Sequence, residues 1–274
     1  MNDVKSSIAI LDMNNGQPNQ GLRCITEIVN TFREEVESKV FDVRSKSELP
    51  DLDYDIYISS GGPGSPLEEG EWKDKFCKWL QSIWHHNATE KNKKFLFLIC
   101  HSFQMAIQYF KLGQITKRKR TSFGIYPIHK EFQGRSDRLL AELPDPYYAV
   151  DSRDWQIIQP NLEVFAQEGC QILSLEKIRT NIELERAIMA VRFSEEIVGT
   201  QFHPEADPTG MKRHFTDKQN QEKVIKNFGK EKYDKMMEQL DDPDKISMTY
   251  NHIIPGFIRR ALDRINEYKP VAIL

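Results

Sequence analysis

One segment, residues 95–106 (FLFLICHSFQMA), constrains the fold of this chain more than any other. An apolar run ends at Cys100, and an amphipathic stretch follows directly from Ser102 to Phe110. A buried strand that turns straight into a helix is typical of a nucleophile elbow, which pushes the corner side chain clear of the sheet. The dipole and free N–H groups of that helix favour an anionic sulfur at Cys100. The alternative is that Cys100 simply ends a core strand as a small apolar residue.

Short apolar runs alternate with longer amphipathic stretches along most of the chain. This alternation predicts a mostly parallel sheet with helices on its faces. The expected strands are residues 7–11, 39–43, 55–59, 94–99, 122–128, 147–150, 163–166, 171–173, 187–193 and 198–202. The helices expected between them are residues 21–38, 69–82 and 102–110.

The pattern changes from Met211 onward, where helical stretches replace the alternation. We therefore expect two parts, a catalytic domain over residues 1–210 and a helical extension over residues 211–274. The apolar stripes of the extension need to be covered. We expect two or three helices that fold back on the core. Whether they also form a lid, a partner surface or a homodimer contact stays open.

Charge and composition exclude several classes of protein. The 38 Lys+Arg and 41 Asp+Glu residues give a net charge of −3, which disfavours nucleic-acid binding. The basic run at residues 117–120 is interpreted as a solvated loop. Apolar runs are too short to span a membrane, and the N-terminus does not resemble a signal peptide. Four cysteines without CxxC spacing favour the cytoplasm, and the histidines show no metal-ligand spacing.

Two further motifs accompany the cysteine elbow. Residues 199–205 (GTQFHPE) place His203 and Glu205 two apart on an extended segment, so the carboxylate can approach the imidazole. A carboxylate in that position orients a catalytic histidine. Residues 59–66 (SSGGPGSP) follow a predicted strand, and their glycines allow backbone N–H groups to approach a substrate oxyanion. Either motif alone is also compatible with a surface strand end or a tight loop.

Together the three motifs resemble the class I (triad-type) glutamine amidotransferase family, specifically the GMP-synthase-like amidotransferase domain. The family patterns S-G-G-P-x-S, G-x-C-x-G-x-Q and Q-F-H-P-E correspond to residues 60–65, 98–104 and 201–205, in the same order. The resemblance covers about residues 6–210. It implies a flavodoxin-like three-layer α/β fold with a mixed, mostly parallel sheet.

The resemblance also implies roles for individual residues. Cys100 would be the nucleophile, His203 the general acid and base, and Glu205 its orienting carboxylate. The backbone N–H groups of Gly62 and His101 would form the oxyanion hole. The expected substrate contacts are Gln104, Ser152 and Arg153, although Arg153 is also compatible with a solvated strand-end side chain.

This sequence departs from the family pattern at the elbow, where Leu98 and Ser102 replace glycines. Leu98 implies a different packing beneath the turn, and the altered strand at residues 148–155 leaves the acyl specificity open.

The implied reaction is hydrolysis of the glutamine side-chain amide through a γ-glutamyl thioester, without a cofactor. Because no ATP-binding synthase motif is present, any ammonia acceptor would belong to a separate partner synthase. Two alternatives stay open. One is a stand-alone hydrolase of γ-glutamyl amides, peptides or polyamine conjugates. The other is a non-catalytic amidotransferase-like regulatory module.

Overall fold

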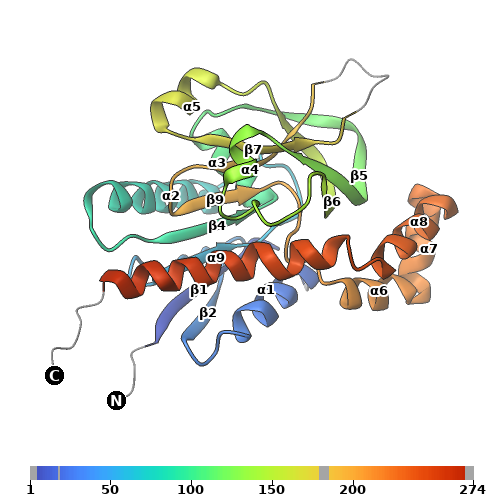
Figure 1. Cartoon of the computed structure of the whole chain (residues 1–274), viewed down its shortest axis with the longest axis horizontal. Coiled ribbons are helices and arrows are strands. Elements are labelled where there is room, and N and C mark those ends of the chain that lie inside the picture. Colours follow the sequence, from blue (N-terminus) through green and yellow to red (C-terminus); the bar gives the residue numbers. More distant parts are fainter. Residues whose placement is uncertain (1–4, 18, 179–184, 269–274) are drawn as a thin grey trace.

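The computed structural model describes residues 5–17, 19–178 and 185–268. In this part of the chain, a single mixed sheet has the strand order β2-β1-β3-β4-β9-β8-β7-β5-β6 (Figure 1). The first five strands in that order are parallel, and the remaining four continue antiparallel. The strands are β1 (Ser6–Asp12), β2 (Val36–Asp42), β3 (Ile56–Ser59), β4 (Phe95–Ile99), β5 (Gln114–Lys130), β6 (Tyr147–Ile158), β7 (Gln171–Glu176), β8 (Ile188–Arg192) and β9 (Ile197–Thr200).

Helices cover both faces of this sheet, because the apolar side chains of its central strands alternate between the faces. Ile8 and Ile10 of β1 pack against α1 (Gln20–Asn30) and α9 (Ile246–Tyr268). Ala9 and Leu11 face α2 (Glu71–Thr89), α3 (His101–Tyr109) and α5 (Leu162–Glu168). A short helix, α4 (Phe132–Ser136), follows β5. Figure 1 shows α1 and α9 on one side of the sheet and α2, α3 and α5 on the other, which confirms the expected three-layer α/β fold.

Two predicted elements were wrong. The helix expected over residues 21–38 ends at Asn30, and β2 begins at Val36, where it pairs with Ser6 of β1. The strand expected at residues 163–166 lies in α5. There the side chain of Asn161 caps the N-terminus, and Gly169 ends the helix in a left-handed conformation with φ of 69°. Sheet pairing and caps therefore decided these segments, rather than apolar periodicity.

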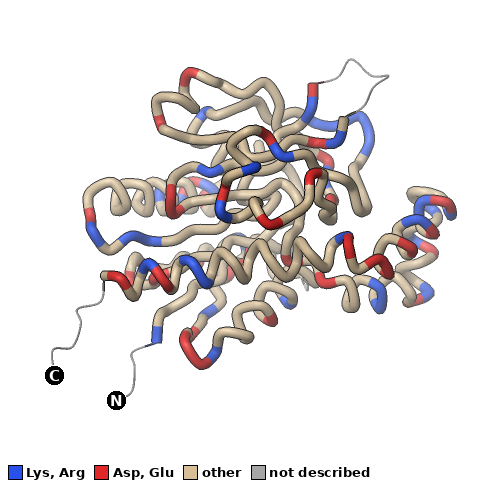
Figure 2. Tube along the Cα trace, viewed as in Figure 1, with Lys and Arg blue, Asp and Glu red and all other residues tan. Residues whose placement is uncertain are grey.

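The basic run at residues 117–120 is part of β5 and not a loop. Lys117 pairs with Trp155 of β6, and the register then shifts before Ser122. The Arg118 side chain is only 10% exposed because it forms an ion pair with Glu176. Figure 2 shows both basic and acidic residues scattered over the described chain.

Beyond the catalytic motifs, the chain forms four helices among the described residues. They are α6 (Pro208–Thr216), α7 (Lys218–Phe228), α8 (Lys230–Asp241) and α9. The boundary expected between residues 210 and 211 falls inside α6. Helices α6 to α8 pack on β5 and β6 through a separate apolar cluster, whereas α9 joins the main core. None of the helices in the described ranges has the length and apolar character that crossing a bilayer requires.

Deletion of residues 212–274 is expected to yield aggregated or unfolded protein. Six large side chains of α9 are buried in the main core: Ile253, Ile254, Phe257, Ile258, Leu262 and Ile265. At about 1.5–3 kcal/mol for each buried side chain, their loss is on the order of 10 kcal/mol, comparable to the stability of a whole domain. Size-exclusion chromatography and circular dichroism would measure the outcome, with a chain ending at Tyr268 as control. A folded, active truncated protein would show that residues 1–211 are an independent domain.

Candidate active site

Cys100 occupies the corner between β4 and α3. Its backbone has φ of 49° and ψ of −98°, a conformation that L-residues rarely adopt. Such strain costs on the order of 1–3 kcal/mol and is maintained only where surrounding contacts hold it. One of these contacts is a hydrogen bond of 2.7 Å from the Cys100 N–H to the Thr200 carbonyl at the end of β9. The elbow predicted from residues 95–106 is therefore present, with its sulfur above the start of α3.

The two departures from the family's glycine pattern are accommodated by neighbouring residues. Leu98 pairs across the sheet with Gly199 of β9. A Cβ at position 199 would lie 2.5 Å from the Phe103 ring and 3.2 Å from the Leu98 Cβ, so the missing side chain at Gly199 makes room for Leu98. Ser102 Oγ accepts a hydrogen bond of 3.0 Å from the Ile99 N–H and lies 3.1 Å from the Ser59 carbonyl of β3. The hydroxyl thus joins the elbow to the neighbouring strand.

His203 and Glu205 follow β9 and form a close pair. The Nδ1 atom of His203 lies 2.7 Å from Oε1 of Glu205, whose side chain is 2% exposed. The His203 N–H donates to the Val150 carbonyl of β6 (2.8 Å), which holds this segment against the sheet. Burial opposes a charge on His203, but Glu205 and the hydrogen-bonded Cys100 side chain outweigh burial and raise the pKa of His203 well above its ordinary value.

Two glycines allow close approach to this pair. An ideal Cβ at Gly61 would lie 2.9 Å from Cε1 of His203 and 3.4 Å from the Cys100 Cβ. A Cβ at Gly21 would lie 3.0 Å from Oε1 of Glu205, so the start of α1 packs against the carboxylate. Gly21 was not among the residues singled out by sequence reasoning, because its proximity to Glu205 depends on how α1 packs.

All eight site residues expected from the sequence line one cavity of about 610 Å³. They are Gly62, Cys100, His101, Gln104, Ser152, Arg153, His203 and Glu205. The backbone of Gly62 packs so closely against Met13 that a side chain would not fit, since a Cβ there would lie 2.3 Å from the Met13 carbonyl oxygen. His101 is the first residue of α3, so its N–H has no carbonyl partner one turn earlier in the helix.

Gln104 and Ser152 contact the elbow from two sides. The Nε2 group of Gln104 donates to Oε1 of Gln201 (2.9 Å) and to the Trp155 carbonyl (3.3 Å). The Ser152 carbonyl lies 3.9 Å from Sγ of Cys100. Ser152 therefore reaches the elbow through its backbone.

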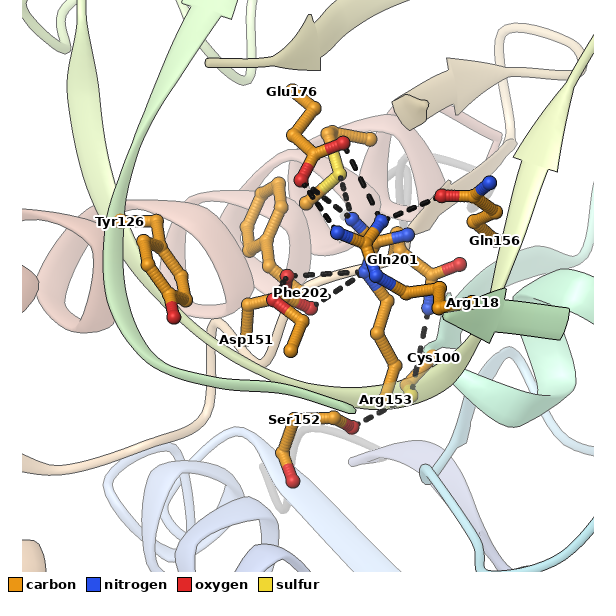
Figure 3. Close-up of polar contacts among 12 residues, drawn as sticks. Cys100, Arg118, Tyr126, Asp151, Ser152, Arg153, Gln156, Glu176, Gln201 and Phe202 are labelled. Carbon is orange, nitrogen blue, oxygen red and sulfur yellow. Dashed lines mark hydrogen bonds and ion pairs between the residues drawn. The ribbon is translucent and has the colours of Figure 1, made fainter. Parts of the chain in front are cut away.

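Gln201 is a contact of the sulfur to which sequence reasoning assigned no role. Its Nε2 lies 3.6 Å from Sγ of Cys100, and its side chain is fully buried (Figure 3). The residue was present in the quoted Q-F-H-P-E motif, so the signal was available. What the motif could not show is that the side chain turns toward Cys100.

Arg153 is not the solvated side chain that was considered for it. Its guanidinium is 1% exposed and forms ion pairs with Asp151 (2.9 Å) and Glu176 (3.5 Å), as Figure 3 shows. Asp151 and Arg153 lie two apart on β6, so their side chains share one face of the strand. Because both carboxylates already pair with it, Arg153 is a structural ion pair at the cavity wall rather than an exposed group.

Arg44 and Trp72 connect the two segments that carry Gly62 and His101. Nη1 of Arg44 donates to the Pro63 carbonyl (2.5 Å), and its other nitrogen pairs with Glu68. The guanidinium lies 4.7 Å from the Trp72 ring centre, and Trp72 stacks on His101 at 6.3 Å. Neither residue was expected near the site, because α2 and the loop after β2 meet only in the folded chain.

The chain matches the family model described as glutamine amidotransferase class-I over residues 21–222. The chain belongs to this family. The match includes the elbow, the Gly61–Gly62 loop and the His203–Glu205 pair, and it extends past the expected boundary at residue 210 into α7. This match confirms the resemblance inferred from the three motifs. The family in general hydrolyses the amide of glutamine.

Solved structures of class I amidotransferases share this fold. A glutamine amidotransferase from Thermotoga maritima is 16% identical, with a TM-score of 0.67 over 95% of this chain and 100% of that one. A glutamine amido transferase from Methylobacillus flagellatus is 11% identical, with a TM-score of 0.65 over 97% and 95%. A putative GMP synthase subunit from Thermoplasma acidophilum is 15% identical, with a TM-score of 0.56 over 97% and 96%. No curated protein matches this sequence.

Among the described residues, no three His, Cys, Asp or Glu side chains are grouped so that they would hold a metal ion.

His101 makes the stability of the fold pH-dependent. Burial, reinforced by Arg44 and Lys73, lowers the pKa of His101 to about 3, whereas in the unfolded chain it is near 6.5. Between these values the unfolded state binds a proton that the folded state does not, so His101 costs stability as the pH falls below about 6.5. We expect this cost to reach about 3 kcal/mol at pH 4.5.

Urea unfolding of the wild type and of His101→Asn at pH 7.5 and 4.5 would measure this effect. The variant is expected to lose about 3 kcal/mol less than the wild type on acidification. Comparing the two proteins cancels the contributions of the carboxylates and of His203 to the change in unfolding free energy, because both proteins contain these groups. The raised pKa of His203 changes the stability with pH in the opposite direction to His101. Equal losses in the two proteins would contradict the burial of a neutral His101.

Proposed function

We propose that this chain hydrolyses the side-chain amide of glutamine to glutamate and ammonia, with Cys100 as nucleophile. One observation carries the proposal: a cysteine on a strained elbow at a helix N-terminus lies beside a His203–Glu205 pair in a single cavity. A nucleophile, a base and a group that orients the base are the parts that acyl transfer requires.

The reaction follows from this geometry. Sγ of Cys100 attacks the amide carbon, and the N–H groups of Gly62 and His101 stabilise the oxyanion. His203 takes the proton of the Cys100 thiol and donates it to the departing ammonia, which leaves a γ-glutamyl thioester. His203 then removes a proton from water, and the resulting attack releases glutamate. Glu205 holds the imidazole in the required tautomer throughout.

We further propose that the ammonia passes to a synthase on a separate chain in the cytoplasm. The similarity to a putative GMP synthase subunit supports this arrangement. The test is glutamate release by the purified protein, alone and with candidate synthases isolated by affinity capture. No glutamate release under any of these conditions would favour the non-catalytic alternative, as would a Cys100 that reacts with iodoacetamide no faster than Cys24, Cys77 and Cys170.

Arg44 is expected to support the oxyanion hole without touching the substrate. It donates a hydrogen bond to the Pro63 carbonyl next to Gly62, and it packs on Trp72, which in turn stacks on His101. Replacing Arg44 with methionine should lower kcat by roughly 10- to 100-fold and leave KM nearly unchanged, because the transition-state oxyanion loses alignment.

Two comparisons separate this effect from general damage. Alkylation of Cys100 by iodoacetamide forms no oxyanion, so its rate should be unchanged in Arg44→Met. Arg259→Met removes a surface arginine that pairs with Glu35 and should retain full activity. A matching loss of alkylation and turnover in Arg44→Met would mean that Arg44 only supports the fold.

A further inference from the structure

The cavity around Cys100 extends beyond the space that glutamine needs. Its volume of about 610 Å³ lies in the range of pockets that hold drug-sized ligands. One end carries the catalytic groups. An apolar part of the lining comes from β5, β6, α6 and the segment that precedes α6: Phe123, Val150, Ala206, Met211 and Phe215. We call this set the apolar wall.

The apolar wall begins one strand away from the sulfur. The Ser152 carbonyl is 3.9 Å from Sγ of Cys100, and Ser152 pairs directly with Phe123 across the β5–β6 ladder. The Phe123 ring meets Phe215 of α6 edge-on, with 5.8 Å between their centres. A group attached to a substrate bound at Cys100 can therefore reach these rings.

This wall is built into the fold. Helix α6 begins three residues after Glu205, and the side chain of Asp207 caps it at Gly210 and pairs with Arg23 of α1 (2.5 Å). On its other side, the Phe123 ring stacks on Phe228 of α7 at 4.6 Å. The C-terminal helices thus hold the aromatic surface in place before a ligand binds, which lowers the cost of binding one.

The charges around the cavity disfavour a charged group at this wall. The two guanidinium groups among the described lining residues are both committed, Arg23 to Asp207 and Arg153 to Asp151. The Asp154 carboxylate accepts a hydrogen bond from Thr121 (2.5 Å). A neutral apolar group would be stabilised by burial against the rings, whereas a charged group held against those rings would lose hydration.

We infer that the preferred substrate is a γ-glutamyl amide whose nitrogen carries a neutral apolar group, such as a branched alkyl or aryl amine. The inference rests on the proposed Cys100 chemistry, but the leaving group is a free amine in place of the ammonia that a partner synthase would receive. Cys100 Sγ bonds to the γ-carbonyl carbon, the C–N bond breaks, and His203 protonates the departing amine. Water then cleaves the thioester, so one γ-glutamyl amide and one water give glutamate and one free amine.

The test compares kcat/KM for glutamine and for the γ-glutamyl amides of methylamine, isopentylamine and putrescine. The γ-glutamyl amides of isopentylamine and putrescine release alkylamines of similar size. The far end of the first amine is apolar, and the far end of the second is cationic. We expect the isopentylamide to exceed the methylamide and the putrescine amide by at least about tenfold, because several added carbons are buried. Equal values, or a preference for glutamine or for putrescine, would overturn the inference while leaving the proposed hydrolysis intact. No turnover of any of the four would instead refute the proposed function.

Two partly buried methionines on the C-terminal helices supply matched variants. Met211 lines the cavity, whereas Met237 of α8 packs in the same apolar cluster away from it. Met211→Ser should reduce the isopentylamide to methylamide ratio at least fivefold, about the effect of one lost apolar contact. Met237→Ser should keep the wild-type ratio. An equal reduction in both variants would show that the C-terminal helices act through stability and not through substrate contact.

Discussion

Replacing Cys100 with alanine is expected to abolish glutamine hydrolysis, with a fall in kcat of roughly 10⁴-fold or more. The thioester cannot form without the sulfur, and no other cysteine can replace it. Burial raises the pKa of Cys24 and of Cys170 to about 12, which keeps both thiols protonated at neutral pH. A coupled glutamate assay on the wild type and the variant would measure the loss.

The fold should survive this substitution. Alanine at position 100 removes one sulfur from the cavity wall, so the thermal midpoint should change by only a few degrees. Cys77→Ala on α2 provides a matched control that should retain full activity, since Cys77 does not line the cavity. Substantial turnover by Cys100→Ala would refute the assignment of the nucleophile.

Replacing His203 with alanine is expected to be nearly as severe, with kcat reduced by roughly 10⁴- to 10⁶-fold. The variant has no group to protonate the leaving ammonia or to activate water. Glu205→Gln should lose less, roughly 10²- to 10⁴-fold, because the amide can still occupy the position 2.7 Å from Nδ1 of His203 but cannot stabilise its charge. Steady-state kinetics over a range of pH would rank the two variants.

The rate of Cys100 alkylation gives an independent measurement. His203 is the proposed acceptor of the Cys100 thiol proton, so iodoacetamide should react more slowly with Cys100 in His203→Ala than in the wild type. His252→Ala on α9 should leave both rates unchanged, since its ring lies near the Met248 carbonyl and Glu142 and is not among the described residues that line the cavity. If Glu205→Gln were more damaging than His203→Ala, the proposed division of roles would be wrong.

Local sequence patterns predicted the central strands and the elbow because the information is local there. Residues 95–99 are apolar on both faces, and only a strand covered on both sides by helices buries them. The same reasoning failed at residues 163–166, where the caps at Asn161 and Gly169 outweighed the apolar pattern. It failed again at residues 31–38, where pairing with β1 ended the helix early.

The residues of the candidate site divide in the same way, into those that a local motif identifies and those that depend on packing between distant segments. Cys100, His203 and Glu205 were identifiable because each lies at a strand end within a short motif, and strand ends of a parallel sheet meet at one edge. Arg44 and Gln201 were not assigned, because their contacts join segments far apart in the chain. For Arg153 the sequence was also compatible with a solvated side chain. Its partner Glu176 lies on another strand, and this ion pair removes the Arg153 side chain from solvent.

By itself, the sequence determined that this protein has a class I amidotransferase core with a cysteine elbow and a His–Glu pair. Those features depend on residue types at fixed short spacings, which set backbone conformation and side-chain direction. Only the tertiary structure decided that Gly199 makes room for Leu98, that Arg153 is buried, and that α6 adds Met211 and Phe215 to the cavity that Cys100 lines. These features depend on packing between distant segments, and packing is determined by the whole chain.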